Sequence, residues 1–135
     1  MVRMKAIYLG AKHCKAVHEP SQDSLDTDAP KDNQGRGESF SPTDLVATAM
    51  GTCVLTTIAI LAEKDGIDVT NSTMSVEKEM TSNPRKIASL KTIIELPRSI
   101  PQEYRAKIEH IGNNCPVRVS LHPDVSVAIE YRYTI

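Results

Sequence analysis

Cysteines are the residues of this chain best suited to covalent chemistry, and two of the three occupy distinctive positions. Cys53 lies in the most apolar segment, which has no charged residue between Asp44 and Glu63. Cys115 precedes Pro116, so we expect it at the N-cap of a short helix, where unpaired amides favour a thiolate. One thiol could attack the O–O bond of a peroxide and become a sulfenic acid, with which the second would form a disulfide. Two unrelated core cysteines are the alternative interpretation.

Length and charge exclude several classes of function. A chain of 135 residues is expected to form one domain over 1–135. The net charge of −1 and the lack of a basic run argue against a nucleic-acid partner. Residues 45–62 are long enough to cross a membrane, but they include four Thr and a Gly, so a buried helix is favoured. An odd, sparse set of cysteines and no expected signal peptide predict a cytoplasmic protein.

The segment around Cys53 carries clear helix signals. Ser41 is a suitable N-cap, Pro42 suits the first helical position, and Asp44 completes a variant of the capping box. We therefore expect a helix from about Pro42 to Lys64. Its apolar residues cover almost every side, which predicts burial on every side. Because the chain has few other elements to cover such a helix, a second protomer is expected to cover part of it.

The remaining segments alternate between strand and helix patterns. Residues 1–18 predict two strands that meet near Gly10, and the loop 19–41 holds a short strand around Ser24–Thr27. A hairpin over 72–81 and 86–96 is followed by a helix over 101–111, a short helix from Pro116 and a strand over 124–134. This order predicts an α+β fold in which antiparallel sheets pack around a long, buried central helix.

Two segments resemble one protein family. SFSPTDLVATAMGTC around Cys53 and NNCPVRVSLHP around Cys115 resemble the osmotically inducible and organic hydroperoxide resistance proteins, the OsmC/Ohr family. TDAPKDNQGRGESFSP looks like a loop of one OsmC-like branch. The resemblance implies an intertwined homodimer with its active sites at the subunit interface. It also implies that Cys53 is peroxidatic and Cys115 resolving, in a peroxidase that reduces organic hydroperoxides as an oxidative stress defence. The implied reductants are thiols, including lipoylated proteins, and no cofactor is expected.

The chain departs from the family beside the peroxidatic cysteine. The family has a catalytic Glu directly after the helix-start Pro, where this chain has Thr43, and the acidic Asp44 follows one residue later. A shift of one residue turns a side chain by about 100° around a helix. Arg36 is expected to supply the cation that stabilises the Cys53 thiolate. Alternatively, Arg36 is a solvated loop residue without a role in the site. Asp44, Thr43 and His122 are the accessory candidates. His122 would act either as a base near the thiols or as a cap of the preceding helix.

Other kinds of site are poorly supported. The four His and three Cys lack the spacing of a zinc site, so no metal is expected. The segment QGRGES matches neither a Walker loop nor a dinucleotide fingerprint. Cys14 is expected to pack on a strand. The alternative function is a non-catalytic protein on the same scaffold, which binds a small molecule or senses redox state, because the family Glu is missing.

Overall fold

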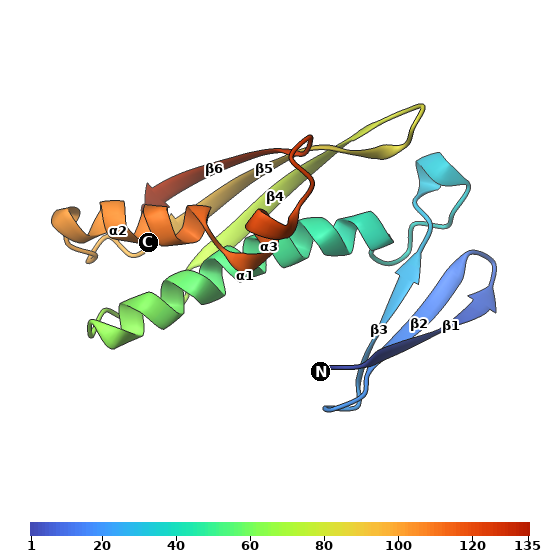
Figure 1. Cartoon of the computed structure of the whole chain (residues 1–135), viewed down its shortest axis with the longest axis horizontal. Helices are drawn as coiled ribbons and strands as arrows, with labels where there is room; N and C mark the ends of the chain where they lie inside the picture. The colour runs from blue at the N-terminus through green and yellow to red at the C-terminus, as the bar shows by residue number, and fades with distance from the viewer. The chain divides into compact units, whose positions relative to one another are not determined.

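The computed structural model describes residues 1–135, which form two compact units, Met1–Val46 and Ala47–Ile135 (Figure 1). A single domain over 1–135 stays a prediction. The first unit is an antiparallel sheet in the order β1-β2-β3. Its strands are β1 (Met4–Gly10), β2 (His13–His18) and β3 (Asp23–Asp28). The predicted strand pair around Gly10 and the short strand near Ser24–Thr27 are both present.

The strands of the first unit lie largely open to solvent in the single chain. Six of the seven β1 residues are exposed, and they include Met4, Ile7 and Tyr8, each at least 60% accessible. After β3 the chain continues through the short 3₁₀ helix η1 (Lys31–Asn33) into the loop that carries Arg36. A three-stranded sheet needs one covered apolar face to be stable, so this unit lacks a complete core of its own.

Helix α1 (Pro42–Lys64) has the predicted bounds. The predicted capping box is also present, because the Asp44 amide donates to Ser41 Oγ at 3.1 Å and the Ser41 amide donates to Asp44 Oδ2 at 2.8 Å. Six α1 residues are buried within the chain, although the sequence predicted burial on every side. By length and composition alone α1 could also cross a membrane, and a third of its most apolar window is buried inside the protein.

The second unit contains a mixed sheet in the order β4-β5-β6. Strands β4 (Thr73–Thr81) and β5 (Lys86–Leu96) form the predicted antiparallel hairpin. Strand β6 (Ser126–Tyr133) pairs with β5 in parallel, which differs from the expected antiparallel arrangement. The reason is the connection: two helices lie between β5 and β6, and such a crossover returns the chain in the same direction.

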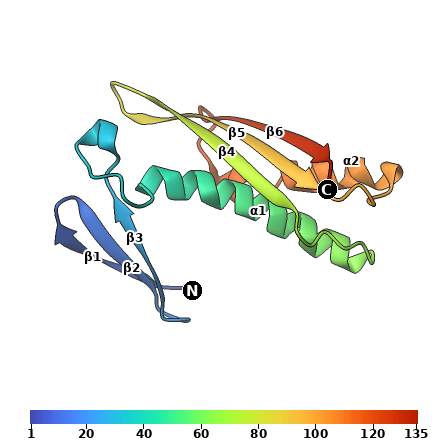
Figure 2. The ribbon, with the colours of Figure 1, turned by 180° about the vertical axis from the view of Figure 1, so that it is seen from behind.

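Helices α2 (Gln102–Asn113) and α3 (Pro116–Ser120) form this crossover. Helices α1 and α2 cover the same face of the mixed sheet (Figures 1 and 2). The core of the unit is built from buried apolar side chains of α1, β5 and α2, namely Met50, Val54, Ile58, Leu90, Ile94, Leu96 and Ile108. Cys115, at the start of α3, is fully buried in the same cluster. One of the two cysteines predicted to be reactive is therefore part of the hydrophobic core.

Candidate thiol site

The two cysteines singled out in the sequence are neighbours in the second unit. Cys53 packs against the core cluster to which Cys115 belongs, and its side chain interacts with the Cys115 thiol. Both cysteines are free thiols. Cys53 comes from the middle of α1 and is half-buried, whereas Cys115 comes from the N-cap of α3 and is buried. Residues 62 positions apart in the chain thus meet through the packing of α3 on the core.

The two thiols have different surroundings. Burial raises the pKa of the Cys115 thiol, and the neighbouring Cys53 raises it further. Backbone N–H groups of Arg118 and Val117 donate to the Cys115 sulfur and oppose this shift in its pKa. The Cys53 sulfur lies 4.0 Å from the Thr57 hydroxyl, one turn later on α1. Cys115 is therefore held as a protonated thiol beside a more accessible partner.

Hydrogen bonds from Tyr131 and Arg118 to Asn113 hold the turn before Cys115. The Tyr131 hydroxyl on β6 donates to Asn113 Oδ1 at 3.3 Å, and the Arg118 guanidinium donates to the Asn113 carbonyl. A Cβ added to Gly112 would lie 2.4 Å from the Tyr131 oxygen, so only glycine lets α2 approach the phenol this closely. Burial is the main reason that the pKa of Tyr131 lies far above its usual value. The phenol therefore keeps its proton and remains a donor.

Arg118 and Thr57 were missed by the sequence analysis, although the sequence held a signal for each. Arg118 follows Cys115 by three positions and Thr57 follows Cys53 by four. Residues with these spacings lie on one face of a helix. No such local signal places Tyr131 next to the site, because this contact depends on the parallel pairing of β6 with β5.

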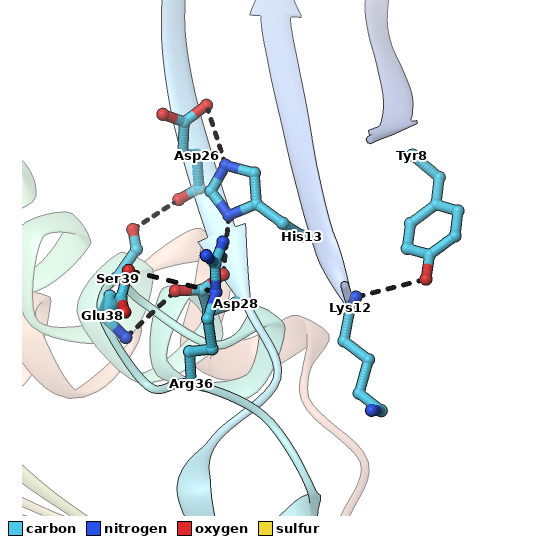
Figure 3. A network of polar contacts seen from close by, with 8 residues as sticks. All are labelled: Tyr8, Lys12, His13, Asp26, Asp28, Arg36, Glu38 and Ser39. Carbon is cyan, nitrogen blue, oxygen red and sulfur yellow. Dashed lines mark hydrogen bonds and ion pairs between the residues drawn. The ribbon is translucent and has the colours of Figure 1, made fainter. Parts of the chain in front are cut away.

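Arg36 belongs to a polar network of the first unit (Figure 3). Its half-exposed side chain lies 4.0 Å from the Glu38 carboxylate, and its charge helps to lower the pKa of Asp28. The larger effect on the pKa of Asp28 comes from the hydrogen bond of His13. The expected contact of Arg36 with Cys53 would join the two units, and it stays a prediction.

The accessory candidates have local contacts of their own. The Thr43 hydroxyl lies 3.2 Å from Ser41 Oγ, and Asp44 forms the capping box at the start of α1. His122 is 72% exposed, and its Nδ1 accepts a hydrogen bond from the Asp124 amide. These contacts organise a helix start and a surface turn, and a catalytic role for Thr43, Asp44 or His122 stays a prediction. Cys14 lies half-buried on β2.

Comparison with known proteins agrees with the fold. A protein from Psychrobacter arcticus, described as a candidate osmotic stress induced and detoxification response protein, is 36% identical with a TM-score of 0.93. The alignment covers 98% of this chain and 96% of that protein. No curated protein sequence gives a significant match.

More distant structures share the fold. An organic hydroperoxide resistance protein from Legionella pneumophila is 18% identical, with a TM-score of 0.77, over 98% of this chain and 96% of its own. The organic hydroperoxide resistance protein OhrB of Bacillus subtilis is 14% identical, with a TM-score of 0.69, over 98% of each chain. The family described as OsmC-like protein matches residues 35–130. The chain therefore belongs to the OsmC-like protein family.

Proposed function

We propose that this protein is a thiol-dependent peroxidase that reduces organic hydroperoxides through Cys53 and Cys115. The contact between two free thiols from α1 and α3 is the observation that carries the proposal. Family membership and the fold shared with organic hydroperoxide resistance proteins support it.

The proposed reaction has three steps. The Cys53 thiolate attacks the distal oxygen of the hydroperoxide, which breaks the O–O bond and releases an alcohol after protonation. Cys53 is thereby oxidised to a sulfenic acid, and the Cys115 thiol condenses with it to form a disulfide and water. A dithiol reductant, such as a lipoylated protein, then reduces the disulfide. The half-buried position of Cys53 and the burial of Cys115 suit the attacking and resolving roles, respectively.

The same proposal includes the other predicted participants. Arg36 stabilises the Cys53 thiolate and the substrate oxygens, while Thr43, Asp44 and His122 are accessory groups. A homodimer completes an apolar pocket next to α1, which favours alkyl hydroperoxides over hydrogen peroxide. Exposed apolar side chains on β1 and α1, including Ile7 and Ile60, support a second copy as the missing cover. The proposed location is the cytoplasm.

The second candidate is a protein of the same fold that binds a small molecule or senses redox state without turnover. It is favoured by Thr43, which has no ionisable group at the position of the family Glu, and by the raised pKa of Cys115. Titration of the Cys53 thiol separates the candidates. A Cys53 pKa well below the usual ~8.5 supports catalysis, and a higher one supports the binding protein.

The decisive experiment follows the consumption of an alkyl hydroperoxide with dihydrolipoamide as the reductant. Cys53→Ser is expected to abolish consumption, because no thiolate remains to attack. Cys115→Ser is expected to allow one turnover that ends in a sulfenic acid, which dimedone traps for mass spectrometry. Cys14→Ser is the matched control and should behave as the wild type. Equal rates for the wild type and Cys53→Ser would remove the enzymatic proposal.

A further inference from the structure

We propose that Arg118 assists the resolving step, by stabilising the Cys115 thiolate when this cysteine attacks oxidised Cys53. The proposal rests on the proposed function, because this attack is the second half of the peroxidase cycle. In this proposal Arg118, from the second unit, is the cation that acts on the resolving thiol. Arg36 is expected to act on the other thiol, Cys53.

The position of Arg118 follows from helix α3, whose N-cap is Cys115. Arg118 is three residues further along α3, so both side chains lie on one face of this helix. The guanidinium donates through Nη1 to the Asn113 carbonyl, two residues before Cys115. The side chain therefore folds back along the turn that holds Cys115.

The guanidinium has an unused donor. Its Nε atom is buried and has no hydrogen-bond partner. The ion pairs of the second unit, which include Lys86–Asp124 and Lys107–Asp65, do not involve Arg118. Buried donors without an acceptor are rare and unfavourable. An acceptor that appears only during the reaction would explain this one. The Cys115 sulfur already accepts a hydrogen bond from the backbone N–H of Arg118, and its thiolate is the acceptor that we assign to the guanidinium.

The resolving step needs this kind of support. Cys115 must lose its proton before it can attack, yet burial and the neighbouring Cys53 both raise its pKa. The titratable groups that face it are Cys53 from α1 and Tyr131 from β6, and Glu109 on α2 acts on Tyr131. The positive charge of Arg118 and the charge of Cys115 both act on the Tyr131 phenol. Of the charged groups around Tyr131 and Cys115, Arg118 is the one that carries a positive charge.

The assisted step is balanced without a further reagent. The Cys115 sulfur attacks the Cys53 sulfenic acid, an S–S bond forms and the S–O bond breaks. The thiol proton of Cys115 leaves with the hydroxyl group of the sulfenic acid as water. Cys53 is reduced and Cys115 is oxidised in the same step. Arg118 lowers the energy of the transient thiolate and keeps its own proton.

The test uses Ellman's reagent, so that it does not depend on a hydroperoxide. In a Cys14→Ser background, Cys53 attacks the reagent and releases one thionitrobenzoate in a first phase. Cys115 then displaces the second thionitrobenzoate from the mixed disulfide, and this second phase measures the reactivity of Cys115. At a pH below the pKa of the thiol, each unit by which this pKa rises lowers the fraction of Cys115 present as thiolate about tenfold.

Arg118→Met is expected to slow the second phase about tenfold at neutral pH and to leave the first phase unchanged. Raising the pH should restore the rate, because more of the thiol ionises without the cation. Arg118→Lys should lose less of the rate than Arg118→Met, since it retains the charge but not the Nε donor. The unchanged first phase, together with a wild-type circular dichroism spectrum, excludes simple unfolding. An unchanged second phase in Arg118→Met, or an equal loss in Arg118→Lys, would overturn the proposal.

A hydroperoxide experiment separates this inference from the proposed function. Arg118→Met should accumulate more dimedone-trapped sulfenic acid on Cys53 than the wild type and form the disulfide more slowly. A wild type that forms no sulfenic acid would refute the peroxidase but would leave the result with Ellman's reagent intact. A normal sulfenic acid signal with a normal rate of disulfide formation in Arg118→Met would refute the role of Arg118 alone.

Discussion

The Nδ1 atom of His13 lies 2.6 Å from Oδ1 of Asp28, a hydrogen bond that joins β2 to the buried end of β3. The other carboxylate oxygen of Asp28 accepts a 3.0 Å hydrogen bond from the Glu38 amide (Figure 3). The Asp28 amide also donates to the Phe40 carbonyl. A single buried aspartate therefore ties two strands to the loop that carries Arg36.

Asp28→Asn should loosen this loop, because the amide that replaces one carboxylate oxygen is a donor and can no longer accept both hydrogen bonds. Trypsin should then cleave after the half-exposed Arg36 faster than in the wild type. Asp23→Asn, at the exposed start of β3, is the matched control and should leave the rate of cleavage unchanged. Equal cleavage of the wild type and Asp28→Asn would show that the carboxylate does not hold the loop.

The same carboxylate predicts a dependence on pH. The hydrogen bond from His13 is the main reason that the pKa of Asp28 lies below its usual value. Ionisation of Asp28 therefore stabilises the fold above the unfolded pKa of ~3.9, and this contribution is lost as the pH falls through the lower folded pKa. Protection of the loop against an acid-active protease should thus persist below pH ~4 in the wild type and be weaker in Asp28→Asn.

Thr92 on β5 is only 2% exposed, and its hydroxyl has no hydrogen-bond partner. Thr92→Val replaces this hydroxyl with a methyl group and should raise the free energy of unfolding by about 1 kcal/mol, measured by urea denaturation. Thr92→Ser keeps the hydroxyl but removes a methyl group, and it should lower the free energy of unfolding by about 1 kcal/mol. A destabilised Thr92→Val variant would mean that the hydroxyl has an acceptor in solution.

Three of the four tyrosines should resist ionisation. Burial is the main cause in each, and it raises the pKa of Tyr104 to about 12 and the pKa of Tyr131 and Tyr133 further. Because phenols of the unfolded chain ionise near pH 10, the stability of the fold should decrease as the pH rises beyond ~10. Tyrosinate absorbance should rise together with unfolding. Tyr104→Phe should reduce this decrease, whereas the exposed Tyr8→Phe should not.

A homodimer should be visible by light scattering, with twice the 14.8 kDa mass of one chain. Ile7→Lys places a charge on the exposed apolar surface of β1 and should shift the protein toward the monomer, because a buried lysine at an interface is unfavourable. Ser126→Lys, on the exposed face of β6, is the control and should stay dimeric. A wild type with the mass of one chain would refute the dimer.

Local signals in the sequence were sufficient to predict most of the secondary structure. The bounds of α1, its capping box and the hairpin of β4 and β5 depend on residues that are close together in the chain. Caps, turn residues and hydrophobic periodicity act over one or two turns of helix or a few residues of strand. The order of these elements, together with two cysteine motifs, was also enough to recognise the family.

Only the tertiary structure decided which of these elements meet. The parallel pairing of β5 with β6 brings Tyr131 next to the turn of Cys115, and the core brings Cys53 to the same place. Likewise, the Nε atom of Arg118 has no hydrogen-bond partner because it is buried, and its burial cannot be predicted from the residues next to it in the sequence. Such contacts join residues that are far apart in the chain, so they depend on how all the apolar faces pack together and not on local conformational preference.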